Sequence, residues 1–224
     1  MKFLFASDSF KGTLTSRRTA ELLTEAAREI FPSCECVSVE MADGGEGTTE
    51  AVISAAGGSR SEARVHGPLW DIRTSCYGKL DDRRAVMEMA AASGLTLVPP
   101  EMRDPRKTTT FGTGEMIRDA LDRGFRDISI AIGGSATNDG GTGCMKALGI
   151  RFLEAEGKEV DGCGEDLIHI RDIDESGLDP RVSECRFTVM CDVSNPLCGE
   201  NGAAYTFGGQ KGGTPEVLDE LEEG

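Results

Sequence analysis

The chain has 224 residues, and its 24 Lys and Arg against 39 Asp and Glu give a net charge of −15. This length allows one large domain or two small ones with a buried core, so no disulfide or metal is required to stabilise the fold. The acidic excess argues against nucleic acids and anionic membranes as partners, because both are bound by clustered Lys and Arg. A small anionic ligand would need backbone N–H groups, a few cations or a metal ion.

The eight cysteines and two histidines predict no zinc site, because no C-x-x-C pair occurs and His66 and His169 are far apart in the chain. The apolar run at the N-terminus ends at Asp8 and is too short for a signal peptide. No stretch approaches the ~18 apolar residues of a membrane helix. We therefore expect a cytoplasmic protein with reduced thiols.

The first part of the chain alternates strands and helices. Residues 3–6 are a continuous apolar run, typical of a strand buried on both faces, and residues 17–31 have apolar residues at helical spacing, with Ser16 as the N-cap. Residues 36–41 predict a second strand and residues 49–56 a second helix. This order predicts a parallel α/β unit.

The rest of the chain begins with short strand-like runs over residues 59–90, which predict an antiparallel meander. A helix, a buried strand, a short helix and another buried strand are then predicted at residues 113–123, 128–132, 144–148 and 187–191. A last helix begins with Thr214 as its N-cap and Pro215 as its first residue.

Four predicted buried strands end in polar or Gly-rich loops, and each loop contains an Asp: Asp8–Gly12, Asp43–Gly47, Gly133–Gly141 and Asp192–Pro196. In open α/β sheets, ligands bind beyond the carboxyl ends of the strands. Any one loop is equally well explained as a turn with an Asp cap, but four in one chain favour a binding site. Carboxylates are suitable Mg²⁺ ligands, and one of them could act as general base toward a hydroxyl group. The pattern does not decide which Asp binds the metal and which acts as the base.

The loop after residue 132 is the most specific of the four. Gly133, Gly134 and Ser135 stand between a strand and a helix, where backbone N–H groups converge and can bind phosphate. The loop matches neither the Walker A pattern nor the dinucleotide fingerprint. Lys11 could pair with a phosphate or carboxylate, although a single loop lysine is more often solvated. No Ser or His has the surroundings of a hydrolase triad.

Six segments occur in a fixed order along the chain: Asp8–Gly12, Met41–Thr48, Glu88–Leu95, Thr108–Glu115, Gly133–Gly141 and Cys191–Gly199. In this order they resemble the glycerate kinase family typified by bacterial glycerate 2-kinases, and the resemblance runs from Met1 to about Lys211. The chain has Gly209 where the family usually has Pro. Family members also continue well past residue 224, with a further Thr-Gly-Glu-Gly-type motif in a part that completes the N-terminal domain.

The resemblance implies ATP-dependent phosphorylation of D-glycerate, usually at the 2-hydroxyl group, with Mg²⁺. It also implies two α/β domains with the active site in the cleft between them. Residues 1–60 would then be the first segment of a discontinuous Rossmann-like domain that is incomplete in this chain. Residues 61–224 would be a second α/β domain with a mixed sheet, and a homodimer is left open.

For such a kinase, we assign the candidate residues by role. The predicted catalytic residues are Lys11, Asp43 and Asp192, and the predicted glycerate-binding residues are Asp8, Ser9, Gly44, Gly45 and Glu46. The predicted nucleotide-binding residues are Gly133, Gly134, Ser135, Asn138, Asp139, Gly140 and Gly141, and the predicted Mg²⁺ ligands are Asp139 and Asp192. The alternatives are a non-catalytic fragment that binds ligand or a missing C-terminal half and, more weakly, an Asp-dependent phosphohydrolase. The last is disfavoured because Asp8-Ser9-Phe10 lacks the second Asp that such enzymes place two residues on.

Overall fold

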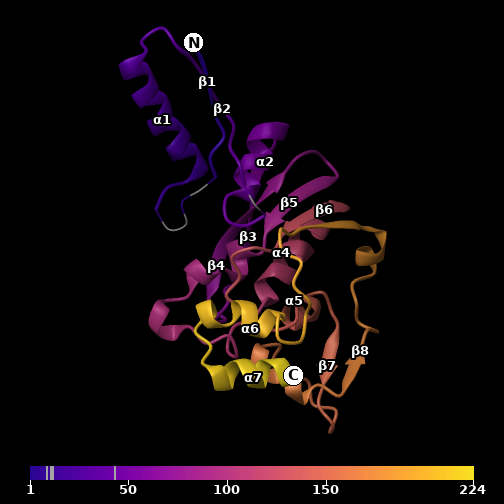
Figure 1. The fold of residues 1–224 in the computed structure, drawn as a ribbon. Helices are drawn as coiled ribbons and strands as arrows, with labels where there is room; N and C mark the ends of the chain where they lie inside the picture. The colour runs from indigo at the N-terminus through magenta and orange to yellow at the C-terminus, as the bar shows by residue number, and fades with distance from the viewer. Residues whose placement is uncertain (9, 11–12, 43) are drawn as a thin grey trace.

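The computed structural model describes residues 1–8, 10, 13–42 and 44–224, which form a mixed α/β fold (Figure 1). The strands are β1 (Lys2–Phe5), β2 (Glu35–Ser38), β3 (Ser59–His66), β4 (Ile72–Lys79), β5 (Arg84–Glu88), β6 (Asp127–Ala131), β7 (Arg151–Leu153), β8 (Asp172–Asp174) and β9 (Arg186–Met190). The helices are α1 (Ser16–Ile30), α2 (Thr48–Ala56), α3 (Ala90–Ser93), α4 (Phe111–Asp122), α5 (Thr142–Ala147), α6 (Ala203–Phe207) and α7 (Pro215–Glu223). Within the described residues, no helix combines the length and apolar character needed to cross a membrane.

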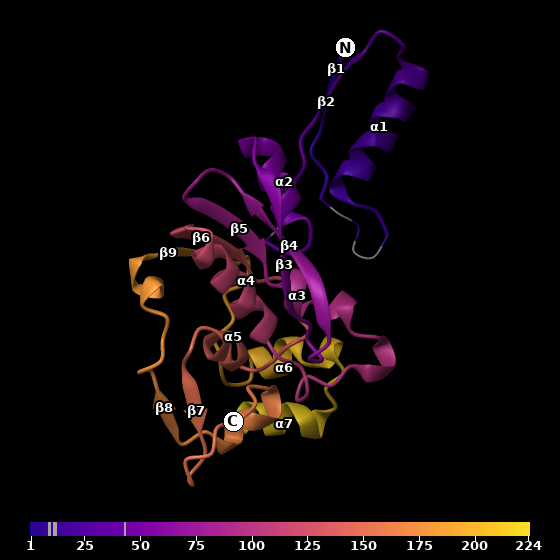
Figure 2. The same ribbon diagram turned by 180° about the vertical axis from the view of Figure 1, so that it is seen from behind.

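The N-terminal strands β1 and β2 pair in parallel as a separate two-stranded sheet, which confirms the predicted parallel unit. With α1, this sheet projects away from the rest of the molecule (Figures 1 and 2). The expectation that β1 is buried on both faces was wrong, since Leu4 is 65% exposed. Among the described residues, β1 has one neighbouring strand, and only the face with Phe3 and Phe5 is partly covered, by contacts that include the ring of Phe31.

The N-terminal cap of α1 differs from the prediction. Thr15, not Ser16, is the N-cap, and its Oγ1 accepts a hydrogen bond from the backbone N–H of Arg18 at 3.1 Å. The Ser16 hydroxyl instead donates to the backbone oxygen of Ser7 at 2.6 Å and accepts from the backbone N–H of Met41 at 3.1 Å. Ser16 therefore joins the segments that follow β1 and β2.

The main sheet has five strands in the order β3-β4-β5-β6-β9. β3, β4 and β5 pair antiparallel, as the meander prediction required, whereas β5, β6 and β9 run parallel. In the parallel part, Glu88 is in register with Ala131, and Ala131 with Met190. The carboxyl ends of three strands therefore meet at one edge of the sheet.

Helices cover both faces of the antiparallel part of this sheet. Tyr77 and Met87 point into the core on one face, where they lie in one apolar cluster with Met116 and Leu121 of α4. Alternate residues point to the other face, where Ile53 of α2 comes so close to Gly78 that a Cβ there would lie 2.9 Å from it. Each fully buried large side chain contributes roughly 1.5–3 kcal/mol to the free energy of unfolding.

The last strand of the sheet is more exposed than predicted. Phe187 is 36% and Val189 is 57% exposed, so the expectation of a buried β9 was wrong. β9 is an edge strand that pairs only with β6 among the described strands. An apolar run identifies a strand but does not show how many neighbours the strand has.

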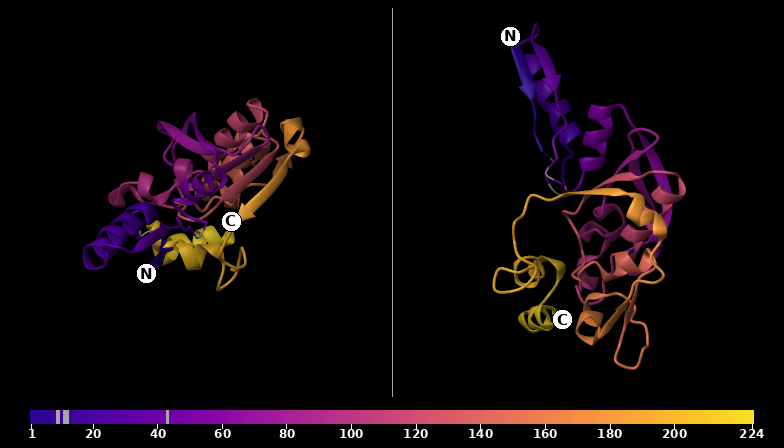
Figure 3. Two further views of the ribbon diagram at one scale, coloured as in Figure 1. Left: turned by 90° about the horizontal axis from the view of Figure 1, so that it is seen from above. Right: turned by 90° about the vertical axis from the view of Figure 1, so that its right-hand side faces the viewer.

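The C-terminal helices α6 and α7 pack on each other through Ala204, Val217 and Leu221. They lie at the end of the molecule away from β1, β2 and α1 (Figure 3). Thr214 caps α7 and Pro215 is its first residue, as predicted. β7 and β8 form a further small antiparallel sheet beside this end.

Candidate functional site

The carboxyl ends of β5, β6 and β9 carry three of the segments singled out by their sequence. They continue as residues 89–95, 132–141 and 191–196. Leu95 donates its backbone N–H to the oxygen of Gly134 at 2.9 Å, and Ala136 donates to Ser93 at 2.8 Å, so the first two segments run side by side. This is the edge at which α/β sheets bind ligands.

The loop between β2 and α2 docks on the same edge through its glycines. Gly133 donates its backbone N–H to the oxygen of Gly44 at 3.0 Å. A Cβ on Gly133 would lie 2.8 Å from the Cα of Gly45, and a Cβ on Gly44 would lie 3.2 Å from the backbone oxygen of Met190. The structure therefore brings together parts of the loop predicted to bind glycerate and of the loop predicted to bind nucleotide, at a distance that larger residues would prevent.

Glu88, at the end of β5, fixes the start of α2. Its Oε1 accepts the backbone N–H of Thr49 at 2.6 Å, and the side chain is buried. Burial raises the pKa of this carboxyl, while hydrogen bonds from Thr49 and Gly47 act in the opposite direction. The role of Glu88 is therefore to hold the loop before α2 against the sheet.

Asp139 organises the Gly-rich loop from inside. Its Oδ2 accepts the backbone N–H of Thr110 at 2.8 Å, the Thr110 hydroxyl at 2.7 Å and the backbone N–H of Gly143 at 3.3 Å. Its Oδ1 accepts the backbone N–H of Gly141 at 3.2 Å, and the residue is only 2% exposed. Both carboxylate oxygens are thus engaged by protein donors, which is the arrangement of a residue that shapes a loop.

The outer side of this loop retains donors for a ligand. The backbone N–H groups of Gly134, Ser135, Asn138 and Gly140 have no hydrogen-bond acceptor among the described residues. Gly134 and Gly140 are exposed, and Ser135 and Asn138 are partly exposed. Unpaired N–H groups on a Gly-rich loop form a concavity that can bind an anion.

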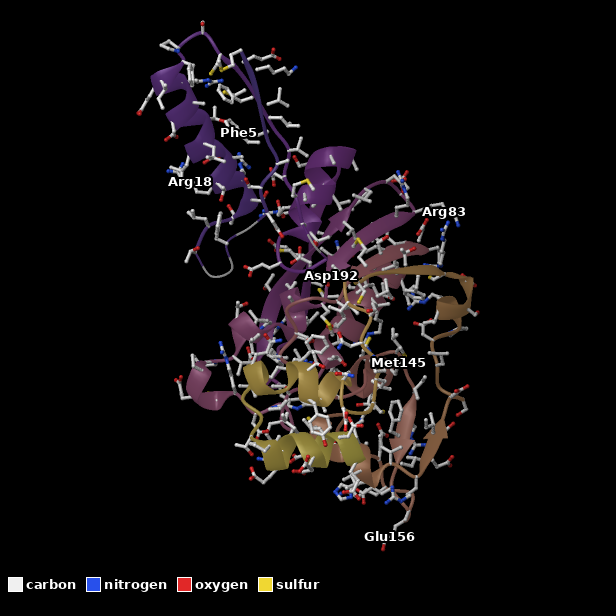
Figure 4. The ribbon with its side chains drawn as sticks, in the orientation of Figure 1. Phe5, Arg18, Arg83, Met145, Glu156 and Asp192 are labelled. Atoms are coloured by element: carbon white, nitrogen blue, oxygen red, sulfur yellow. The ribbon has the colours of Figure 1, made fainter. Side chains whose placement is uncertain are left out.

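Asp192 lies just beyond β9, and its side chain is exposed. It lines a hollow together with Met41, Gly44 and Thr48, so the segments after β2 and β9 face the same space. Figure 4 shows Asp192 between α2 and α6 in that view. Glu46, from the same loop as Gly44, is also exposed.

The remaining predicted residues lie in the N-terminal part of the chain. Lys11, Ser9 and Asp43 lie outside the described residues. Asp8 follows β1 and is exposed. Ser7, the residue before Asp8, is linked to Met41 through the two hydrogen bonds of Ser16. Met41 lines the same hollow as Asp192.

One buried cation next to the Gly-rich loop was not predicted as a site residue. Lys211 is only 7% exposed, and its Nζ donates to the backbone oxygen of Thr137 at 2.5 Å. Burial lowers its pKa to about 8, partly offset by the charge of Asp139. The sequence held one signal, because the segment Phe207–Gly212 is rich in glycine, but nothing local linked it to residues 74 positions earlier.

A mixed α/β chain whose Gly-rich loops meet at the carboxyl ends of parallel strands has the architecture of enzymes that bind phosphorylated ligands. The chain belongs to the glycerate kinase family, since the model of the "Glycerate kinase family" matches residues 3–224.

Individual relatives agree with this assignment. The chain is 49% identical over 223 residues to the "Glycerate 2-kinase" of Escherichia coli K12 and 46% identical over 224 residues to the "Glycerate kinase" of Bacillus subtilis 168. A crystal structure from Salmonella typhimurium LT2, provisionally described as a glycerate kinase 2, superposes with a TM-score of 0.84 at 48% identity. These matches cover 99–100% of the chain but only 58–60% of the relatives. The chain therefore spans about three fifths of their length.

Proposed function

We propose that this protein phosphorylates D-glycerate with ATP, to 2-phosphoglycerate, by in-line phosphoryl transfer. Membership of the glycerate kinase family and the names of the relatives support this proposal. The single observation that carries it is the set of backbone N–H groups, without an acceptor in the described part of the chain, on the loop that Asp139 shapes next to Gly44 and Gly45. Such a loop can bind nucleotide phosphates in a chain of net charge −15.

In the proposed mechanism, the N–H groups of Gly134, Ser135, Asn138 and Gly140 bind and orient phosphate oxygens. The adjacent loop, with Gly44, Gly45 and Glu46, positions glycerate beside them, together with Asp8, Ser9 and Lys11. A carboxylate, Asp43 or Asp192, accepts the proton of the attacking hydroxyl group. Positioning and electrostatic stabilisation supply most of the rate in phosphoryl transfer, so a rigid pair of loops is well suited to it.

The residues present fit a role for Mg²⁺, which in such enzymes is typically held by one or two carboxylates and the substrate phosphates. The exposed carboxylate of Asp192, beside the Gly44 loop, is the candidate ligand. Bound there, the ion would neutralise charge on the phosphate oxygens. Asp139 was predicted as a second ligand, but its engaged oxygens support a positioning role, which we propose instead.

We also propose the domain division implied by the family. Residues 1–60 would belong to a Rossmann-like domain that is incomplete in this chain, and residues 61–224 would form a second α/β domain with a mixed sheet, with the site between the two domains. The separate sheet of β1 and β2 supports the division, while α2 packs on β4 and β5 and thus contacts the second part. Eight free thiols support a cytoplasmic location. A homodimer stays a prediction.

Calorimetric titration with MgATP and a coupled assay of ADP release test the proposal. We expect ADP release that depends on D-glycerate and falls by at least about a hundredfold in Asp192→Asn, the range for loss of a general base or metal ligand. Asp82→Asn is the matched control, because the side chain of Asp82 is 99% exposed. Equal activities of the two variants would remove Asp192 from the mechanism, and absence of MgATP binding would contradict the proposed function.

A second candidate is a non-catalytic fragment that binds a complementary segment. The exposed apolar residues Leu4, Phe187 and Val189 favour it. Adding the remaining part of a relative as a separate polypeptide distinguishes the active kinase from the non-catalytic fragment. Binding of the two pieces with no turnover supports the fragment.

A further inference from the structure

Lys211 is an unusual lysine, because its charged end is buried. It ends the short 3₁₀ helix Gly209–Lys211, and its side chain reaches across to the Gly-rich loop after β6. Long cationic side chains normally keep the charged end in water while their methylene groups cover apolar surface. Here the residue is 7% exposed and the ammonium contacts the backbone oxygen of Thr137 inside the loop.

The ammonium of Lys211 is incompletely paired. It carries three N–H donors, and Thr137 provides its only hydrogen-bond acceptor among the described residues. No carboxylate of the described chain lies within ion-pair distance of it; the nearby Asp139 has its own donors. A buried charge without an ionic partner lowers stability, so a purely structural role would be better filled by an apolar residue.

A second cationic residue, Arg103, packs beside the residue that follows Lys211. The backbone oxygen and Cβ of Arg103 pack against Gly212, the residue after Lys211, so closely that a Cβ on Gly212 would overlap them. The Nε of Arg103 is buried and has no hydrogen-bond partner within the described part of the chain. Two residues with incompletely paired cationic groups are thus linked in this acidic protein, since Arg103 packs against the residue that follows Lys211. Lys211 in turn contacts the loop whose N–H groups have no acceptor among the described residues.

We propose that Lys211 is a catalytic residue that contacts the phosphate oxygens of the nucleotide, with Arg103 as the second cation of the same anion site. The inference rests on the proposed function and names a contact for it. A nucleotide phosphate, rather than the carboxylate of glycerate, is the ligand because Lys211 is hydrogen-bonded to the loop proposed to bind the nucleotide, whose N–H groups have no acceptor among the described residues. Lysine binds phosphate as a point charge, and no bond to Lys211 forms or breaks.

The role follows from this contact. Phosphate oxygens would supply the acceptors that the two remaining N–H groups of the ammonium lack, and they would compensate the buried charge. As the terminal phosphoryl group is transferred, negative charge builds on the leaving diphosphate, and a fixed cation stabilises it. The hydrogen bond to Thr137 would hold the ammonium in place before the nucleotide binds.

The test is calorimetric titration of the chain with MgADP and, separately, with D-glycerate, for the wild type, Lys211→Met and Arg103→Met. Loss of a charged hydrogen-bond donor is expected to weaken MgADP binding by about tenfold to a hundredfold, with D-glycerate binding unchanged. Lys158→Met is the matched control, because the side chain of Lys158 is 78% exposed, and its affinity for MgADP should equal that of the wild type. Thermal unfolding of Lys211→Met should occur at the wild-type temperature or above it.

Other outcomes overturn the proposal. If Lys211→Met binds MgADP with wild-type affinity, Lys211 does not contact the phosphate. If this variant also unfolds at a lower temperature than the wild type, the role of Lys211 is structural. If the variants bind D-glycerate more weakly but MgADP normally, the two cations contact glycerate and not the nucleotide, which contradicts the proposal. If Lys211→Met does not fold, Arg103→Met decides, since wild-type affinity in that variant contradicts the two-cation site. A wild-type chain that binds no MgADP contradicts the proposed function itself, which separates that failure from failure of this inference.

Discussion

Thr110 and Asp139 are joined by two hydrogen bonds to one carboxylate oxygen, from the backbone N–H at 2.8 Å and from the hydroxyl at 2.7 Å. The same hydroxyl accepts the backbone N–H of Cys144 at 2.9 Å. Thr110 precedes α4 and Cys144 lies in α5, so this pair ties the Gly-rich loop to the starts of two helices. The shape of the proposed phosphate-binding loop therefore depends on the buried carboxylate of Asp139.

Asp139→Ala tests this dependence. Removing the carboxylate leaves the buried N–H groups of Thr110 and Gly143 without an acceptor, so the free energy of unfolding should fall by about 2–4 kcal/mol. Urea denaturation measures it, with Asp82→Ala as the control at a fully exposed carboxylate, where a change within about 0.5 kcal/mol is expected. Equal stability of the two variants would show that Asp139 does not hold the loop.

Gly133→Ala tests the close approach of the two loops. The added methyl group would lie 2.8 Å from the Cα of Gly45, so the loop with Gly44 must move away. We expect a loss of about 1–3 kcal/mol in the free energy of unfolding, as for overpacked sites, and weaker binding of MgADP. Gly209→Ala is the control, because nothing lies within 4 Å of a Cβ at that position. If Gly133→Ala binds MgADP with wild-type affinity, the position of the Gly44 loop does not affect nucleotide binding.

Glu88 is tested by a pair of substitutions. Glu88→Gln keeps an oxygen that can accept the N–H of Thr49, so its stability should stay within about 1 kcal/mol of the wild type or exceed it, whereas Glu88→Ala should lose about 1–3 kcal/mol. Thermal unfolding of both variants at neutral pH measures the difference. If Glu88→Ala is as stable as Glu88→Gln, the hydrogen bond to Thr49 does not fix α2.

The pH dependence of stability gives Glu88 a second test. Because the pKa of Glu88 is raised in the folded state above its ordinary 4.5, folding favours the protonated form. The wild type should therefore lose stability relative to Glu88→Gln as the pH rises from 4.5 through the folded pKa, and the gap should close below 4.5. A gap that is independent of pH across this window would show that the carboxyl titrates normally.

Much of the fold could be predicted from local pattern. The parallel pair β1 and β2, the meander, and the cap of α7 follow from apolar runs, turn residues and the Thr214-Pro215 pair. The cap of α1 was misplaced because two hydroxyl residues, Thr15 and Ser16, stand side by side and either can cap a helix. The exposure of β1 and β9 depends on which elements lie beside them, and an apolar run does not contain that information.

The candidate site was predicted as a set of loops, and the structure brings Gly44, Gly45 and Gly133 together. The direction in which a side chain points was not predictable. Asp139 has the sequence surroundings of a ligand-binding residue but points inward to Thr110, 29 residues earlier. Lys211 reaches the loop from 74 residues later, a distance at which a single sequence offers no signal.

The proposed kinase activity is tested most directly by measuring the transfer of the terminal phosphoryl group from ATP to D-glycerate. The chain, MgATP and D-glycerate are incubated, and the product is identified by ³¹P nuclear magnetic resonance. We expect 2-phosphoglycerate, formed more slowly by Gly133→Ala than by Gly209→Ala. A folded chain that binds MgATP and D-glycerate but forms no phosphoglycerate would contradict the proposed activity.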